Sequence, residues 1–350
     1  MSNASHTVSG NQLRVTHQVS NEEAGLRLDQ FMKNVSRRRS RQQIQEVIDS
    51  GRVEIERKQS PHLTLGKIKP SLKLFEGDVV TLINIRKPEP RVDLDYKVLF
   101  EDETLLVIDK PANLPVHPAG KYYFNTLLVH LRSQGYTAPM DANKEFYLVH
   151  RIDKETSGIL VLTKTSETSA HLCDQFSGRT VKKTYLAIVK GVPKEKEFTV
   201  KFPLGRDPQS KIRLKMTHIE EANGGLNAET EFKCLDSFSG YSLIECHPHT
   251  GRQHQIRIHL ALSGYPIVGD KLYGLTESEA YTLFEDPYLK DGALERMISP
   301  ETQAKLILER HALHAHAIDF IHPVTNKSLR LQAPLTKDLV DFIEKLKNKD

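Results

Sequence analysis

The sequence predicts an α+β protein, in which a mixed, largely antiparallel β-sheet domain with flanking helices follows a small α/β domain at the amino terminus. Three observations predict this class. Two short helical patterns and a strand pattern occupy residues 28–55. Strand patterns then recur at residues 105–108, 147–164, 181–191, 227–246 and 311–320. Helical patterns separate or follow them at residues 125–131, 166–176, 250–264 and 339–346.

Length and composition indicate a soluble globular protein. With 350 residues, 38% hydrophobic and 27% charged, the chain is long enough for two cores. The net charge of +4 is mildly basic, so partner preference must come from local clusters. The three cysteines, Cys173, Cys234 and Cys246, are widely spaced, which indicates neither a disulfide framework nor a zinc site. No segment suits a membrane span, so we expect a cytoplasmic monomer without membrane partners.

The amino-terminal part divides into three segments. Residues 1–23 are rich in Ser, Asn, Thr and His and are expected to form a disordered leader. A folded domain is expected at residues 24–85, where Ser40 and Gln43 form a capping-box pattern at the start of its second helix. Residues 86–91, charged and containing two prolines, are typical of a linker, and the larger domain is expected at residues 92–350.

Basic residues cluster at the start of that second helix. Guanidinium groups beside the free N–H groups of a helix terminus predict a phosphate-binding surface, although a solvated cationic face explains the cluster equally well. The cluster comprises Arg37, Arg38, Arg39, Ser40 and Arg41.

The chain is organised around residues 147–164, where two apolar runs flank a polar loop. Within the loop, Asp153 lies between Arg151 and Lys154, and we expect its carboxylate to be ionised. An ionised and sheltered carboxylate can act as a nucleophile or a base. Spacing alone favours the alternative that Asp153 braces the loop through the hydroxyls at positions 156 and 157.

The sequence His-Arg-Ile-Asp-Lys-Glu-Thr-Ser-Gly at residues 150–158 resembles the signature of the RluA-type pseudouridine synthases, with Ile152 where Leu is usual. The resemblance implies that Asp153 is the catalytic residue. Residues 109–118 are similar to the family's first motif, with Asn113 where Gly is usual; Asn tolerates the positive φ that such a turn needs. Arg151 is implied as the residue that fills the space left by a flipped nucleotide.

Two further motifs supply candidate site residues. Tyr185 follows a core-strand pattern, and its Lys-x-Tyr-x-Ala context resembles the family's motif in which Tyr stacks on the target base. Thr250 and Gln253 form a second capping-box pattern, which predicts a helix that holds Arg257 rigidly. Residues 250–257 resemble the family motif whose last Arg pairs with the catalytic Asp, which implies Arg257 as that partner.

RNA-binding features lie outside these motifs. Residues 24–85 are similar to the S-four-like RNA-binding domain, and a tethered domain of this kind would raise the effective concentration of RNA. Lys211, Arg213 and Lys215 alternate, so a strand there would place them on one face, either as a phosphate track or as a solvated surface.

The resemblance implies conversion of uridine to pseudouridine in structured RNA without metal or cofactor. The sequence lacks a Walker motif and a dinucleotide-binding glycine motif. Ribosomal RNA is slightly preferred over transfer RNA as the expected target, because relatives with the amino-terminal domain act on large-subunit ribosomal RNA, whereas residues 115–126 are similar to a branch that modifies transfer RNA. The polar excursion at residues 275–310 is a candidate for setting this choice.

Two other functions compete with this interpretation. The first is a non-catalytic RNA-binding or ribosome-assembly protein, which should have lost the central motif that this chain keeps. The second is a metal-dependent hydrolase, because histidines can ligate metal, yet no nearby set completes a known spacing. The histidines concerned are His247, His249, His254, His311, His314 and His316.

Overall fold

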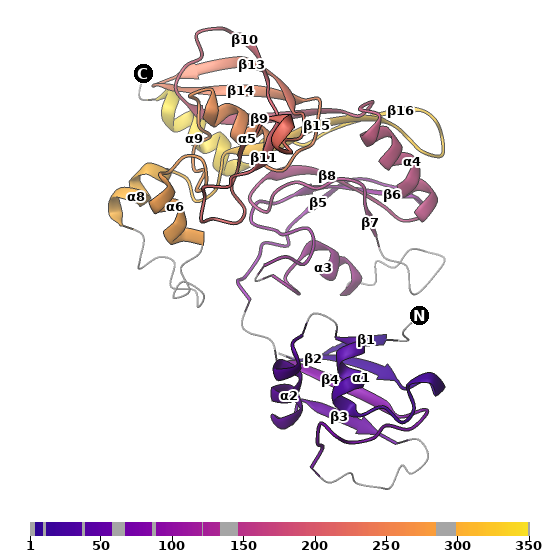
Figure 1. Ribbon diagram of the computed structural model, residues 1–350. Helices are drawn as coiled ribbons and strands as arrows, with labels where there is room; N and C mark the ends of the chain where they lie inside the picture. The colour runs from indigo at the N-terminus through magenta and orange to yellow at the C-terminus, as the bar shows by residue number, and fades with distance from the viewer. Residues whose placement is uncertain are drawn as a thin grey trace. The chain divides into compact units, whose positions relative to one another are not determined.

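The computed structural model shows a chain that forms two compact units, Met1–Glu89 and Pro90–Asp350 (Figure 1). The structure describes residues 4–9, 12–36, 39–57, 67–85, 89–120, 122–133, 146–284 and 299–348. The division between the units falls within the segment expected to be a linker.

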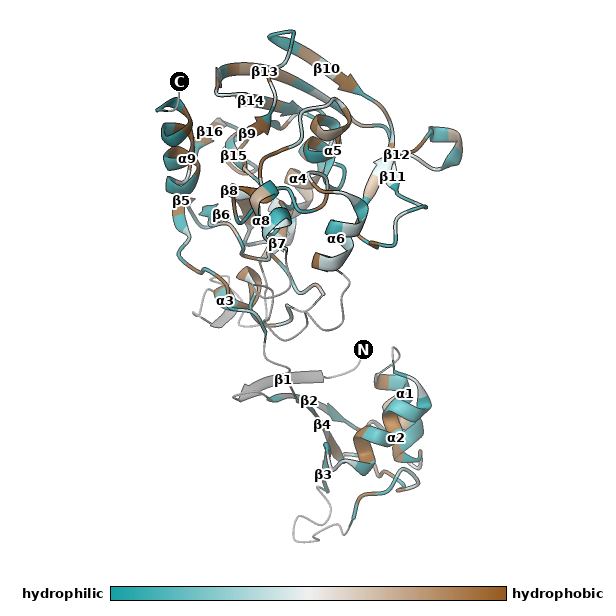
Figure 2. Ribbon diagram, turned by 90° about the vertical axis from the view of Figure 1, so that its left-hand side faces the viewer, coloured by the Kyte–Doolittle hydropathy of each residue, from teal (hydrophilic) through white to brown (hydrophobic). Residues whose placement is uncertain are grey.

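The first unit packs two helices on a four-stranded antiparallel sheet. The strands are β1 (Ala4–Ser9), β2 (Gln12–Gln18), β3 (Val53–Glu56) and β4 (Val79–Ile85), in the order β1-β2-β4-β3. Both helices, α1 (Leu28–Val35) and α2 (Arg41–Asp49), turn an apolar side to the core and a polar side outward (Figure 2). Ser40 caps α2 and accepts a hydrogen bond from Gln43, as the sequence predicts.

The expectation of a disordered leader at residues 1–23 is wrong for its described part. β2 pairs with β4 along its whole length, and a short 3₁₀ helix (Asn21–Glu23) follows it. Polar composition hid the strand, because most residues of β2 are polar and its buried residue is His17, while the buried Val19 follows only after the strand has ended.

The second unit is built on a large mixed sheet, as predicted. Its main path runs β10-β13-β14-β9-β15-β8-β6-β5, with β16 beside β15 and β7 beside β8. All of these pairings are antiparallel except that of β15 with β8, which is parallel. The strands are β5 (Lys97–Glu101), β6 (Leu105–Lys110), β7 (Tyr147–Leu148), β8 (Ser157–Thr163), β9 (Lys182–Lys190), β10 (Glu197–Lys201), β13 (Glu229–Phe238), β14 (Tyr241–Pro248), β15 (Leu313–Ile321) and β16 (Ser328–Gln332).

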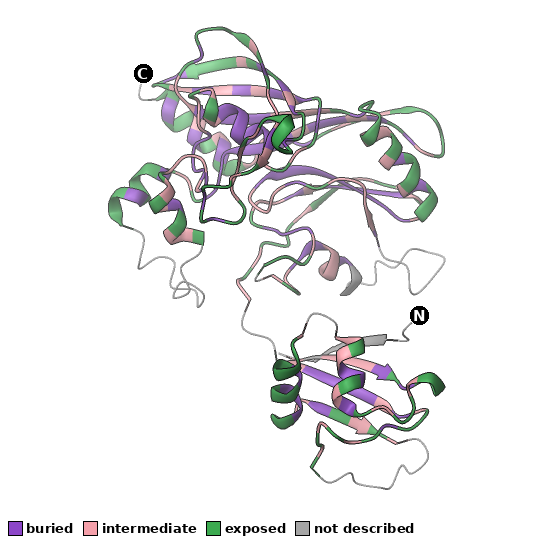
Figure 3. Ribbon diagram, in the orientation of Figure 1, coloured by how far each residue is buried: buried purple, intermediate pink, exposed green. Residues whose placement is uncertain are grey.

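Strand β8 is buried along its entire length because both of its faces are covered (Figure 3). Leu160 and Leu162 pack with α3 (Leu127–Ser133) on one face. Ile159 and Val161 pack with α4 (Ser166–Ser177) on the other face. A continuous apolar run is what a strand covered on both faces requires, and it fixes the position of the polar loop that precedes it.

The remaining helices surround the other half of the sheet. The almost wholly buried helix α5 (Gln255–Leu262) contributes Ile256 and Leu260 to a core shared with β9, β13 and β14. The excursion after β14 and α5 holds α6 (Glu277–Phe284) and α8 (Pro300–Leu306), and α9 (Lys337–Lys347) is the last element of the described chain. Within the described ranges no helix is long and apolar enough to cross a membrane.

The prediction of a strand that carries Lys211, Arg213 and Lys215 is wrong. The strands here are β11 (Leu204–Arg206) and β12 (Met216–His218), which pair with each other, so the basic residues lie in the connection between them. A 3₁₀ helix (Glu221–Asn223) follows β12. The connection is fixed because the Ile212 side chain is buried and Lys215 forms an ion pair with Glu277 of α6 at 2.5 Å.

Candidate active site

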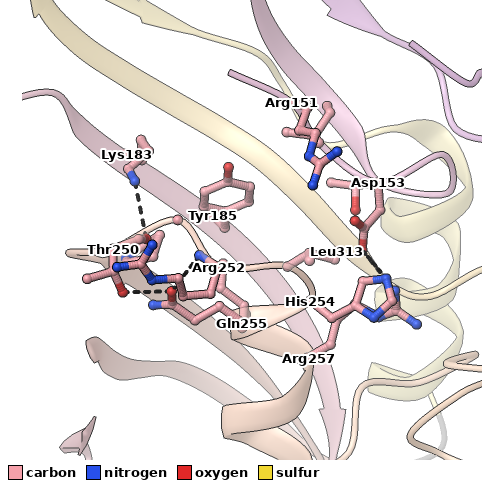
Figure 4. A pocket seen from close by; sticks show the side chains of 15 residues that line it. Arg151, Asp153, Lys183, Tyr185, Thr250, Arg252, His254, Gln255, Arg257 and Leu313 are labelled. Atoms are coloured by element: carbon pink, nitrogen blue, oxygen red, sulfur yellow. Dashed lines mark hydrogen bonds and ion pairs between the residues drawn. The ribbon is translucent and has the colours of Figure 1, made fainter. Parts of the chain in front are cut away.

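A pocket in the second unit gathers Arg151, Asp153, Tyr185 and Arg257, which come from three separate places in the chain (Figure 4). Arg151 and Asp153 belong to the loop before β8, Tyr185 to β9 and Arg257 to α5. Figure 4 shows Tyr185 between the Lys183 side and the Asp153 side of the pocket. The four residues that the sequence predicts for the reacting site are therefore neighbours.

Arg257 lies between two carboxylates. Its Nη1 donates a hydrogen bond to Asp153 Oδ2 at 2.8 Å. Its Nε and Nη2 donate to the two oxygens of Asp270 at 2.7 and 2.9 Å, which is the bidentate geometry that suits a guanidinium fork. Asp270 is buried and also accepts the backbone N–H groups of Leu272 and Tyr273. The guanidinium of Arg257 therefore has a fixed orientation, and its Nη1–H group points to Asp153.

This arrangement keeps Asp153 ionised. Burial acts to raise the pKa of its carboxyl, but neighbouring positive charge, of which the Arg257 guanidinium is the permanent source, outweighs burial and holds the pKa below its usual range. Burial and Arg257 lower the pKa of His254 to about 4, so His254 is neutral at pH 7 and Arg257 is the cation that acts on Asp153. The direct ion pair is thus with Arg257 on α5, and Lys154 points instead to Tyr122.

The alternative in which Asp153 braces its loop through the neighbouring hydroxyls is wrong. Thr156 Oγ1 bonds to His311 Nε2 at 2.8 Å, and Ser157 Oγ bonds to His314 Nδ1 at 2.9 Å. Both histidines are buried. The hydroxyls therefore anchor the loop to β15 and the residues before it, and the Asp153 carboxylate remains available to the pocket.

Gly158 allows this anchoring. It has a φ of 103°, and a Cβ atom added to it would lie 2.2 Å from the carbonyl oxygen of Ala315. Ala315 is its partner in the parallel pairing of β15 with β8. Only glycine lets the two backbones approach so closely, which gives the Thr-Ser-Gly end of the motif a physical reason.

The helix that carries Arg257 begins later than predicted. Its first residue is Gln255, and the residue before it, His254, has the left-handed φ of 56°. Thr250 Oγ1 donates to Gln255 Oε1 at 2.7 Å, so the pair that closes this turn is Thr250 with Gln255, not Thr250 with Gln253. The spacing was misjudged because the residues between them form a separate turn.

Tyr185 is half-buried, and burial raises the pKa of its phenol, so it stays protonated. Lys183 lies two residues earlier on β9 and also faces the pocket, where its Nζ donates to the carbonyl of Thr250 at 3.4 Å. Burial lowers the pKa of Lys183 to about 8. An aromatic ring and a partly desolvated cation thus share this side of the pocket.

Sequence reasoning missed Asp270 and Glu155, and it considered His254 and His311 only as metal ligands, although all four shape the site. Glu155 accepts a hydrogen bond from Lys271 Nζ at 2.6 Å and lies 3.6 Å from His311 Nδ1. Glu155 lies in the central motif, and Asp270 follows the helix predicted at residues 250–264. Neither position reveals its partner without the fold.

The basic cluster of the first unit is only partly described. Arg37 and Arg38 lie outside the described residues. Arg39 bonds to Asn84 of β4 and is half-buried, and burial lowers the pKa of its guanidinium. Ser40 caps α2, and Arg41 is exposed. Arg41 is thus the described arginine of the cluster that faces solvent.

The histidines of the metal-hydrolase alternative have other partners. His247 and His249 pair with Glu245 and Glu231 at 3.0 Å, and His314 and His316 bond to the carbonyl of Ala333. Across the described part of the chain, no group of three or more His, Cys, Asp or Glu is placed to hold a metal ion.

Known proteins share both the sequence and the fold. The sequence model of the RNA pseudouridylate synthase family matches residues 104–262. An uncharacterized RNA pseudouridine synthase of Bacillus subtilis is 30% identical over 96% of this chain and 99% of its own. The chain belongs to the RNA pseudouridine synthase family. The ribosomal large subunit pseudouridine synthase D of Nitrosomonas europaea is 32% identical over 93% of this chain and 86% of its own.

A solved structure agrees with this synthase family. The human RNA pseudouridylate synthase domain containing 4 superposes with a TM-score of 0.54 at 28% identity, over 71% of this chain and 92% of that one. The chain is therefore an isomerase that acts on uridine in RNA, and the non-catalytic alternative is not favoured.

Proposed function

We propose that this synthase modifies a uridine of large-subunit ribosomal RNA, with Asp153 as its catalytic residue. The observation that carries the site assignment is the Asp153 carboxylate, which Arg257 holds ionised at 2.8 Å in the pocket that Tyr185 also lines. Relatives from Nitrosomonas europaea and Vibrio cholerae, named as ribosomal large subunit pseudouridine synthases, support the choice of ribosomal over transfer RNA.

The reaction breaks the N1–C1′ bond of uridine and forms a C5–C1′ bond. C5 loses its proton and N1 gains one, so no electrons are exchanged with an outside group. Asp153 begins the reaction either by attacking C1′ or by taking the C2′ proton. Arg257 holds the carboxylate in place and charged, and Asp270 prevents the guanidinium from turning.

In this proposal the pocket receives one nucleotide that has left its stack. Flipping a base costs on the order of a few kcal/mol, which contacts in the pocket must offset. Tyr185 offers a ring on which the uracil stacks, and the exposed Arg151 fills the place that the nucleotide leaves in the RNA. Lys183 is a cation within reach of the flipped nucleotide's phosphate.

The first unit serves as an S-four-like RNA-binding domain in this proposal. Its α2 begins with a capped and basic amino terminus, a favourable place for an RNA phosphate. Arg41, the described arginine of this cluster that faces solvent, makes this contact, and the exposed Lys211 and Arg213 add a second basic site on the larger unit. The three cysteines are free thiols, which supports a cytoplasmic enzyme, and we expect it to act as a monomer.

The test is a map of pseudouridine in total RNA from cells that lack this protein, complemented with wild type or with Asp153→Asn. We expect one or a few sites in large-subunit ribosomal RNA to disappear, and wild type alone to restore them. Asp174→Asn, the same change on the exposed side of α4, is the matched control and should restore them fully.

Each outcome decides one part of the proposal. Sites lost from transfer RNA would reject the ribosomal target while keeping the chemistry. Restoration by Asp153→Asn would reject the active-site assignment. If no site disappeared even in cells stripped of other synthases, the activity itself would be rejected.

A further inference from the structure

His254 is held at the edge of the pocket in a conformation that a side chain rarely adopts without support. Its backbone φ of 56° lies in the left-handed region, directly before α5. Such a conformation is strained for a residue with a side chain and persists only where the surroundings impose it. Its side chain is 10% exposed and lines the pocket together with Asp153. This backbone conformation places the imidazole of His254 beside the carboxylate of Asp153.

The hydrogen bonds of His254 fix which ring nitrogen carries the proton. The backbone N–H of Met216 donates to the hydroxyl oxygen of Tyr273 at 3.1 Å, and the same hydroxyl lies 2.9 Å from His254 Nδ1. Burial raises the pKa of Tyr273, so its hydroxyl keeps a proton to donate. A neutral imidazole has one acceptor and one donor nitrogen. Because the Met216 N–H already donates to this hydroxyl oxygen, we assign Nδ1 as the acceptor of the Tyr273 proton and Nε2 as the nitrogen that carries the N–H.

That N–H faces Asp153 without bonding to it. His254 Nε2 lies 3.9 Å from Asp153 Oδ2, which is too long for a direct hydrogen bond. A single hydroxyl group at roughly 2.8 Å from each atom would bridge them, donating to the carboxylate and accepting from Nε2. His254 Nε2 thus offers a donor, and the Asp153 carboxylate an acceptor, for a single hydroxyl group.

The reaction identifies that hydroxyl. In either mechanism the Asp153 carboxylate approaches C1′ or the hydrogen on C2′, and the oxygen bonded to C2′ is the nearest hydroxyl of the nucleotide. We propose that His254 and Asp153 together bind the ribose 2′-hydroxyl of the target uridine, with His254 Nε2 as the donor. This assignment rests on the proposed role of Asp153.

The pair would give the enzyme a means to distinguish RNA from DNA at the reacting nucleotide itself. A 2′-hydroxyl is both donor and acceptor, and it is the group by which a protein recognises ribose. With a deoxyribose in the pocket, the buried N–H of His254 would lose its partner, which a site built around a hydroxyl penalises.

A double-mutant cycle between protein and RNA tests the contact. Two short RNAs carry the mapped target site and differ only in having uridine or 2′-deoxyuridine there. Single-turnover rates and dissociation constants are measured for wild type and His254→Phe. We expect His254→Phe to weaken action on the ribose RNA by about fivefold or more and to leave the deoxyribose RNA almost unchanged.

The double-mutant cycle cancels effects on rate or binding that do not involve the contact between His254 and the 2′-hydroxyl. A change in C2′ acidity caused by deoxyribose affects both enzymes equally and drops out of the coupling. Where the deoxyribose RNA reacts too slowly to follow, the four dissociation constants give the same cycle. Equal losses by His254→Phe on both RNAs would overturn the assignment, because a role in packing alone predicts that result.

Two further variants sharpen the test. His254→Gln keeps an N–H donor and should recover part of the preference for ribose. His249→Phe removes an imidazole that is 45% exposed and paired with Glu231, and should leave the preference unchanged. Failure of wild type to convert any uridine would reject the proposed function, whereas conversion without coupling would reject only the 2′-hydroxyl contact.

Discussion

Arg257 and Arg41 show two ways in which one side chain type is used in this chain. Arg257 is buried on α5, and its three hydrogen bonds go to two carboxylates that are themselves held in place. Arg41 is exposed at the start of α2. The guanidinium of Arg257 is held in one orientation, which a group at a reaction site requires. The exposed guanidinium of Arg41 can take many orientations, which suits contact with a phosphate backbone of varying shape.

The largest expected effect comes from removing the fork of Arg257 while keeping its charge. Arg257→Lys cannot bond to both oxygens of Asp270 and to Asp153 at once, so we expect kcat to fall by about 100- to 1,000-fold. Single-turnover conversion of the target RNA measures it. Arg330→Lys, on exposed β16, is the matched control, and equal activity of the two variants would show that charge alone suffices.

The next largest effect tests how closely the backbones of β8 and β15 must approach each other. In Gly158→Ala the new Cβ would meet the Ala315 carbonyl oxygen at 2.2 Å while the backbone keeps its φ of 103°. We expect a loss of about 3 kcal/mol or more in the free energy of unfolding of the second unit. Chemical denaturation measures it. Gly240→Ala, at a φ of 79° with no atom near the new Cβ, separates backbone strain from the clash.

A smaller effect is expected on the pH dependence of kcat/KM. In wild type the pKa of Asp153 lies below its usual range, so kcat/KM should stay level as the pH falls from 7 to about 5, a window below the pKa of Lys183. In Arg257→Gln the burial of Asp153 is no longer opposed by this cation, and its pKa rises. Because the ionised form is active, residual kcat/KM should then fall with decreasing pH within this window. Parallel profiles for the two enzymes would contradict the assignment.

The smallest effect is expected at Arg41. Arg41→Ala removes one exposed charge, so the dissociation constant for RNA should rise by about two- to fivefold, and the slope of its salt dependence should decrease by about one. Filter binding at several salt concentrations measures both. A change in kcat at saturating RNA would show that the contrast with Arg257 is wrong.

Local patterns were enough to predict most elements of this fold. The two helices of the first unit, the buried strand β8 and the helix α4 follow from apolar spacing and capping residues. The positive φ of Asn113 was likewise predicted, and its observed value is 61°. These features depend on neighbours within a few positions in the chain.

Features that depend on distant partners were missed. Alternation suggested a strand at Lys211, whereas pairing of β11 with β12 makes that segment a connection. Local spacing explained the charge of Asp153 only by its neighbours Arg151 and Lys154, and the family resemblance alone implied its direct partner, Arg257, which is 104 residues away. Asp270 was missed, and His254 was considered only as a metal ligand, because their contacts exist only after the chain has folded.

The loop before β8 is held by residues much later in the chain, and this has a consequence for synthesis of the protein. Thr156 and Ser157 are held by histidines 155 and 157 residues further along the chain. Arg310, which precedes those histidines, donates to the Glu155 carbonyl and is paired with Asp338 at 2.7 Å. On the ribosome, the acid of the pocket emerges long before its supports. A chain that terminates before Asp338 therefore carries every residue of the pocket and lacks the ion pair that secures its loop.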